Sequence, residues 1–81
     1  MNHSEQLIRS LTMILLYLTS WEESDFERRD LRAWKGYDFD VLNELEDKGL
    51  ISVSHKAKSV YLSEKGIAVA KKLLKDYGLS R

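Results

Sequence analysis

The residues of this chain that could bind a metal or move a proton are two histidines and a group of carboxylates. His3 and His55 are far apart in the sequence, and the chain contains no cysteine. A zinc site or a catalytic triad needs several such groups in a recognisable spacing. The carboxylates belong to one acidic segment that lacks the motifs of a catalytic pocket, and they are Glu22, Glu23, Asp25 and Glu27. We therefore expect no catalysis, no bound metal, no cofactor and no small-molecule substrate.

Basic side chains are concentrated where they could contact phosphate groups. The segment 28–35 has four of them against the single carboxylate of Asp30, and two lysines belong to the polar segment 55–58. Side chains of this kind position a protein on a nucleic-acid backbone, and an asparagine amide can pair with adenine. The candidate nucleic-acid-binding residues are Arg28, Arg29, Arg32, Lys35, Asn43, Lys56 and Lys58.

Two features weaken this prediction of nucleic-acid binding. The formal net charge is zero, from 13 basic and 13 acidic side chains, whereas proteins held to nucleic acid by bulk charge are basic. The segment 38–48 also has five carboxylates against the single basic residue Lys48. A helix of that composition would bring carboxylates towards phosphates, so we expect contacts from the segment 28–35 and from 55–58 instead.

Protein–protein interaction is the competing function. Large aromatic and apolar side chains are the residue types that are enriched at interface hot spots. The candidate interface residues are Met13, Leu16, Tyr17, Trp34, Tyr37 and Tyr61. For Trp34 and Tyr37, the alternative is that they complete a small core around Gly36.

The first element that must position these residues is a helix ending near Leu18. Its apolar residues recur at helical spacing, and the stripe predicted to face inward contains Leu7, Ile8, Leu11, Ile14, Leu15 and Leu18. Met13, Leu16 and Tyr17 would then face solvent. Either the aromatic segment that follows covers this second face, or another subunit covers it.

The remaining elements are predicted from capping residues and alternation. Residues 19–27 are expected to form a loop, and 30–34 a brief helix with Leu31 and Trp34 on its buried side. A central helix is expected between an Asp38 cap and Gly49, with an inward face made of Phe39, Val41, Leu42 and Leu45. Residues 50–54 and 59–63 read as two strands of a hairpin, with Tyr61 outward, and Ser63 caps a last helix.

The chain resembles small bacterial winged-helix regulators in two motifs, LxxLExKGLI at 42–51 and VYLSEKG at 60–66. The segment AWKGYD at 33–38 is similar to an uncharacterised bacterial family of short winged helix-turn-helix proteins. The resemblance implies an α+β winged helix-turn-helix fold of three to four helices with a two-stranded β-hairpin wing. In such regulators the third helix enters the major groove and the wing touches the backbone.

Together these patterns predict one winged-helix domain over residues 1–81 that acts as a non-catalytic binding module. Its expected partner is duplex DNA, as for a transcription regulator; the alternative is a protein-interaction or homodimerisation module that does not bind DNA. We expect a bacterial, cytoplasmic protein. We also expect no membrane segment, because the apolar run 11–18 is far shorter than the roughly 20 residues of a spanning helix.

Overall fold

The computed structural model describes residues 3–25, 28–53 and 58–79, with the main chain alone at 3, 23–25 and 28–30. The elements in chain order are α1 (His3–Leu18), β1 (Trp21–Asp25), β2 (Arg28–Trp34), α2 (Phe39–Asp47), β3 (Ile51–Val53), β4 (Ser59–Leu62) and α3 (Glu64–Asp76). The expectation of an α+β protein with three to four helices is therefore confirmed, since the described residues form three helices and a sheet.

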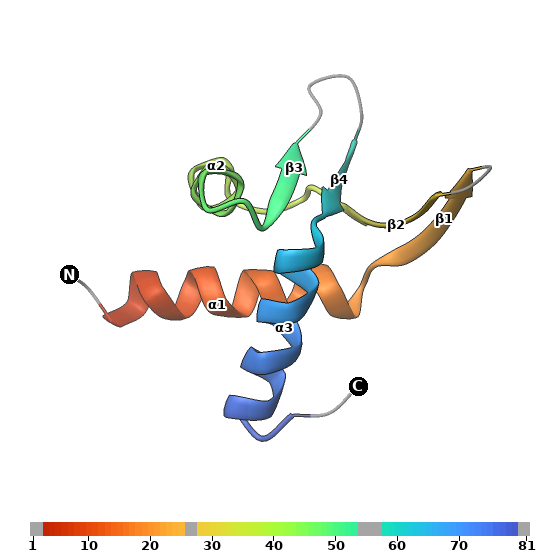
Figure 1. The fold of residues 1–81 in the computed structure, drawn as a ribbon. Helices are drawn as coiled ribbons and strands as arrows, with labels where there is room; N and C mark the ends of the chain where they lie inside the picture. Colours follow the sequence, from red (N-terminus) through yellow and green to blue (C-terminus); the bar gives the residue numbers. More distant parts are fainter. Residues whose placement is uncertain (1–2, 26–27, 54–57, 80–81) are drawn as a thin grey trace.

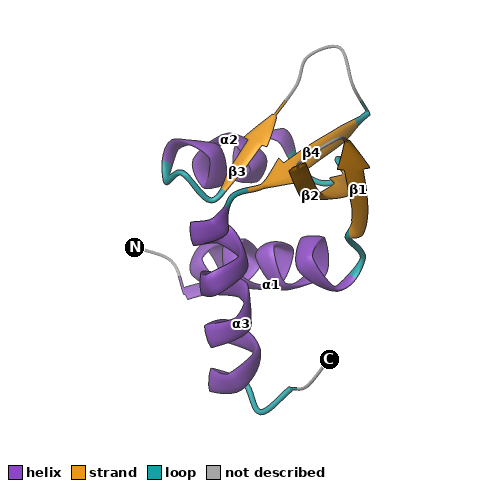
Figure 2. Ribbon diagram, turned by 45° about the vertical axis from the view of Figure 1, so that its right-hand side comes forward, coloured by secondary structure: helices purple, strands orange, loops and turns teal. Residues whose placement is uncertain are grey.

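The four strands form one antiparallel sheet in the order β1-β2-β4-β3. In Figures 1 and 2, α1 and α3 cross each other on one side of this sheet, and α2 lies beside β3. The hairpin of β3 and β4 occupies the position predicted for the wing, although its turn, with Lys56, lies outside the described residues. The sheet differs from the expected two-stranded wing because β1 and β2 extend it across β4.

Strands β1 and β2 correct two expectations, a loop at 19–27 and a brief helix at 30–34. The segment alternates with the period of a strand: Leu31 and Ala33 pack into the core, whereas Trp34 is 62% exposed. Strand β2 pairs with β1 over residues 28–32 and with β4 over residues 31–34. Only the connection 35–38 separates β2 from α2. The described residues 28–38 therefore contain no helix.

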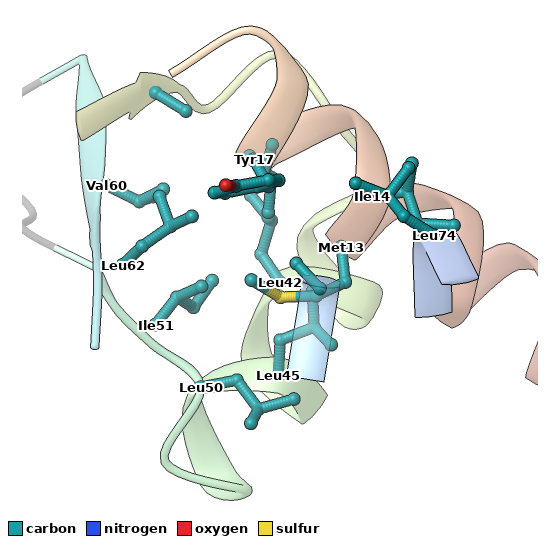
Figure 3. Packing of buried hydrophobic residues seen from close by; sticks show 13 residues of the cluster. Met13, Ile14, Tyr17, Leu42, Leu45, Leu50, Ile51, Val60, Leu62 and Leu74 are labelled. Carbon is teal, nitrogen blue, oxygen red and sulfur yellow. The ribbon is translucent and has the colours of Figure 1, made fainter. Parts of the chain in front are cut away.

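Helix α1 is packed with the opposite face inward from the one predicted. Met13, Leu16 and Tyr17 are 1%, 0% and 7% exposed, so they belong to the core and offer no surface to a partner. Figure 3 shows Tyr17 beside the β4 residues Val60 and Leu62. The prediction failed because α1 is apolar on nearly all sides, so that its periodicity alone does not select the face that meets the sheet.

The stripe that was expected to be buried contributes only one residue to the core. Ile14 is 3% exposed and lies beside Leu74 of α3 (Figure 3). The remaining members are each between about a third and a half exposed, and they are Leu7, Ile8, Leu11, Leu15 and Leu18. Met13, Leu16 and Tyr17 are therefore covered within the chain, as core residues beside β4 and not by the aromatic segment that follows α1, and an uncovered apolar face remains on the other side of the helix.

Helix α2 begins and ends where its sequence predicts. The Asp38 carboxylate accepts from the main-chain N–H groups of Asp40 and Val41 at 2.8 and 3.3 Å, and Gly49 has a φ of 74° just beyond the helix. Leu42 and Leu45 are buried as expected. Phe39 is 69% exposed against expectation, because the core cluster reaches α2 only from Val41 onwards.

Helix α3 is fixed to the sheet at its first residue. Ser63 caps it by accepting from the Gly66 N–H at 2.9 Å, and the Ser63 hydroxyl lies 2.6 Å from the Gly49 carbonyl oxygen, to which it donates. The Ser63 N–H donates to the Leu50 carbonyl at 3.0 Å. The predicted cap is confirmed, and the same side chain joins the end of α2 to the start of α3. Among the described residues, no helix has the length and apolar character needed to cross a membrane.

Candidate nucleic-acid interface

One face of the sheet points away from the core. The register places Trp21 opposite Arg32, Arg32 opposite Tyr61, and Tyr61 opposite Ser52. Directly opposed residues point to the same side of an antiparallel sheet, and their neighbours in sequence point to the other side. That other side is the core side, where Ala33, Val60, Leu62 and Ile51 are buried. We call the outward set, Trp21, Arg32, Trp34, Ser52 and Tyr61, the outer face.

Aromatic contacts organise this outer face. The Trp21 and Trp34 rings have their centroids 4.9 Å apart, with their planes tilted by 44°. The Arg32 guanidinium carbon lies 4.4 Å from the centroid of the Tyr61 ring. Tilted aromatic pairs and cation–π contacts of this kind hold side chains in fixed orientations. Since Trp34 is 62% exposed, a preorganised aromatic surface is open to a ligand.

Two lysines lie at the end of this face where Trp34 pairs with Ser59. The Lys35 N–H donates to the Lys58 carbonyl at 3.1 Å, so the main-chain pairing of β2 with β4 continues one step beyond the strands. Lys58 is exposed and Lys35 is partly exposed. The main chains of both lysines therefore lie next to Trp34 and Ser59 at this end of the sheet.

The main chain at the start of β2, which includes Arg28 and Arg29, pairs with β1. The register places Arg28 opposite Asp25 and Arg29 opposite Ser24, so the basic segment runs directly beside the acidic one. Their side chains, and the whole of Lys56, lie outside the described residues. Among the basic residues, we therefore restrict the candidate interface to those whose side chains the structure describes, Arg32, Lys35 and Lys58.

Helix α2 uses two of its carboxylates to hold the fold together. Arg9 of α1 forms an ion pair with Glu44, with 2.9 Å between guanidinium nitrogen and carboxylate oxygen. The Glu46 carboxylate accepts from the Val53 N–H of β3 at 2.8 Å. These contacts explain part of the acidity of α2 without a ligand. Asn43 is exposed on α2 and does not belong to the outer face.

The predicted interface residues are divided by the structure. Trp34 and Tyr61 belong to the outer face, whereas Tyr37 is partly buried against the core cluster. Sequence reasoning missed Trp21, which belongs to the segment 19–27 that was expected to form a loop. The signal that could have found it is the alternation shared by both strands, but this becomes visible only when β1 is paired with β2.

A groove between α1 and α2 has a free volume of about 320 Å³ and an acidic lining. Its polar lining residues are Glu5, Arg9, Asp38, Asp40 and Glu44. Asp38 already caps α2, and Glu44 already pairs with Arg9. Among the described residues, no group of histidines and carboxylates has an arrangement that could hold a metal ion. The groove is therefore explained by the junction of the two helices.

Comparison with known protein families gives a match over almost the whole chain. The model of a family described as a domain of unknown function (DUF6429) matches residues 4–80. The matched range runs from α1 past the end of α3, so it contains every residue of the outer face. No curated protein and no solved structure matches this chain.

Proposed function

Because the chain belongs to the DUF6429 family, whose description states no function, we propose one from its own residues: it is a non-catalytic nucleic-acid-binding module. Its contact surface is the outer face together with Lys35 and Lys58. The observation that supports this most is the exposed Trp34 ring, which is fixed against Trp21.

The chemistry of this surface suits an unpaired strand better than an intact duplex. Bases stack on exposed aromatic rings with about 1–3 kcal/mol per base, whatever their identity, and neighbouring cations bind the phosphates. A duplex hides the faces of its bases, so Trp34 could not stack on them without opening the helix. We therefore propose single-stranded DNA or RNA as the ligand, in place of the duplex DNA expected from sequence.

The topology is compatible with a winged-helix-like domain, and we propose that relationship as well. Helix α2 is followed by the antiparallel hairpin of β3 and β4 and then by α3, which is the order of third helix, wing and last helix in winged-helix regulators. In this proposal the wing is the hairpin of β3 and β4, which contributes Ser52 and Tyr61 to the outer face. Lys58 directly precedes β4. A cytoplasmic location, where such ligands are present, is part of the same proposal.

The test measures the affinity of the protein for three fluorescently labelled probes by anisotropy at low salt: single-stranded DNA, single-stranded RNA and duplex DNA. We expect either single strand to bind more tightly than the duplex. Replacement of Trp34 by alanine should weaken single-strand binding roughly 5- to 100-fold, because it removes a stacking surface. Trp34→Phe should retain most of the affinity. The matched control is Phe39→Ala, which removes an equally exposed ring from α2 and should change nothing.

Each result decides the proposal. Tighter binding of the duplex would refute the single-strand ligand and favour the duplex interpretation. If none of the three probes binds at low salt, nucleic-acid binding is wrong and the protein-interaction alternative is left. If Phe39→Ala weakens binding as much as Trp34→Ala, the contact surface has been assigned to the wrong part of the molecule.

A further inference from the structure

The face of α1 that points away from the core carries a continuous apolar stripe. Leu7, Ile8, Leu11, Leu15 and Leu18 are 43%, 49%, 46%, 45% and 37% exposed. An amphipathic surface helix normally shows polar and charged residues on its solvent side. On α1 the solvent side carries these five apolar residues instead. The helix therefore has a second apolar face that the described residues leave uncovered.

The spacing within this stripe is that of a two-helix seam. Ile8, Leu11, Leu15 and Leu18 are separated by three, four and three positions, which are the steps between the a and d positions of a heptad. The other uncovered positions on this arc of the helix are Leu7, Ser4 and Thr19, and none of them is charged. A seam that consists of branched aliphatic side chains without charge is complementary to another copy of itself.

We infer that this stripe, the α1 seam, is a homodimer interface at which α1 packs antiparallel against α1 of a second copy of the chain. The net charge of zero means that two copies do not repel each other over a distance. A two-fold axis near position 13 would place Leu11 opposite Leu15 of the second copy and Ile8 opposite its Leu18. Such an isologous pairing uses the same patch on both subunits and closes at the dimer.

The position of the sheet favours the antiparallel arrangement. Strands β1 and β2 follow directly from the C-terminal end of α1 (Figure 1). A parallel pairing would bring the two sheets together at one end, whereas an antiparallel pairing places them at opposite ends. Since Met13, Leu16 and Tyr17 fill the core side of α1, the seam lies on the side remote from the sheet. The outer face therefore stays accessible in both copies, and the inference does not rest on the proposed function.

The size of the stripe indicates a weak dimer. Five aliphatic side chains that are nearly half exposed present about 400 Å² of apolar surface per chain, within the range of the largest patches on monomers. A standard interface buries about 800 Å² per partner, so the α1 seam would be the apolar centre of a smaller contact. We expect a dissociation constant in the micromolar range, and a mass that depends on protein concentration.

The test is sedimentation velocity over a wide concentration range, with four proteins compared. The wild type should sediment as a 9.4 kDa monomer when dilute and approach twice that mass when concentrated. Leu11→Glu should remain monomeric, with dimerisation weakened about 100-fold or more, because it buries a charge at the centre of the seam. The matched control is Phe39→Glu, which adds the same charge at an exposed apolar residue outside the seam and should dimerise like the wild type.

The fourth protein tests the orientation of the helices. In Leu11→Glu combined with Leu15→Lys, an antiparallel dimer brings each glutamate opposite a lysine of the second copy and should recover part of the affinity lost in Leu11→Glu. A parallel dimer would oppose glutamate to glutamate and recover nothing. Circular dichroism of each variant checks that the helices are retained, as expected for substitutions at half-exposed positions.

The inference is overturned if the wild type stays a monomer at every concentration, or if Leu11→Glu dimerises as well as Phe39→Glu. If the double variant does not recover, the antiparallel arrangement is wrong. These outcomes are independent of nucleic-acid binding, because a monomeric Leu11→Glu variant retains an intact outer face and should still bind a single strand.

Discussion

At the scale of single residues, Gly66 limits how closely α3 can approach the sheet. A Cβ atom added at Gly66 would overlap the carbonyl oxygen of Leu50 and lie 2.9 Å from its carbonyl carbon. Both are main-chain atoms at the start of β3, where Leu50 is also bonded to Ser63. The glycine is therefore required by packing and not by its backbone angles.

Replacement of Gly66 by alanine should lower the free energy of unfolding by about 3 kcal/mol, the upper part of the usual cost of overpacking a core. That is a large fraction of the roughly 5–10 kcal/mol expected for a domain of this size. The measurement is denaturant unfolding followed by tryptophan fluorescence. Gly36→Ala is the matched control, because no atom lies within 4 Å of the added Cβ there. Equal effects of the two substitutions would contradict the close approach of α3 to Leu50.

The outer face also depends on single residues for its geometry. Arg32 lies over the Tyr61 ring and Trp34 against Trp21, so two side-chain pairs organise the surface that we propose for ligand binding. Each pair joins neighbouring strands, β2 with β4 and β2 with β1. The exposed area of Trp34 is thus held in place by residues that are themselves less exposed.

At the scale of secondary-structure elements, Ser63 is the joint between the second half of the sheet and α3. Its hydroxyl accepts from Gly66 of α3 and donates to the Gly49 carbonyl at the end of α2. Its main-chain N–H is bonded to Leu50. A single residue therefore fixes the direction in which α3 leaves β4.

Ser63→Ala should destabilise the protein by about 1–2 kcal/mol, because it removes an N-cap and leaves the Gly49 carbonyl without this donor. Ser52→Ala on the exposed side of β3 is the comparison, and it should stay within about 0.5 kcal/mol of the wild type. Both can be measured by thermal and chemical unfolding. A loss for Ser63→Ala no greater than that for Ser52→Ala would show that the cap contributes little.

Helix α2 corresponds to the third helix in the winged-helix relationship that we propose, but two of its carboxylates make contacts within the fold. Its inward residues Leu42 and Leu45 are in the core, while Glu44 and Glu46 bind Arg9 and the Val53 main chain. The carboxylates thus attach α2 to α1 on one side and to β3 on the other. In our proposal α2 is a support for the sheet, and the ligand is bound by the outer face.

At the scale of the whole molecule, charge is balanced and locally arranged. The 13 basic and 13 acidic side chains cancel, so no long-range attraction draws the protein to nucleic acid. In our proposal, binding then depends on the few cations Arg32, Lys35 and Lys58. That makes the salt dependence of binding an informative quantity.

We expect a plot of the logarithm of the single-strand binding constant against the logarithm of the salt concentration to have a slope of about −2. Each phosphate contact contributes roughly −0.7, and the proposed interface has the three cations Arg32, Lys35 and Lys58. Lys58→Ala should make the slope shallower by about 0.7, whereas Lys72→Ala on the exposed side of α3 should leave it unchanged. Anisotropy titrations between about 50 and 300 mM salt provide the values. A much steeper slope for the wild type would mean that a larger basic surface contributes.

Sequence alone was sufficient to predict the helices and the hairpin in the second half of the fold. Asp38, Gly49 and Ser63 mark the ends of α2 and the start of α3 through bonds to residues only a few positions away. Caps and short hairpins depend on such local contacts, so their signals are present in any window of the chain. For the same reason Lys58 and Tyr61 were correctly assigned to the predicted hairpin.

Only the tertiary structure decided the first half and the assembly of the candidate interface. Helix α1 has apolar residues on nearly every side, and the face that is buried depends on which one meets β4 and α3. Strand β1 exists through pairing with β2, and its sequence has no strong local preference that would predict it. Trp21, Arg32, Trp34 and Tyr61 become neighbours through the register of three strands, which is a property of the sheet and not of any single segment.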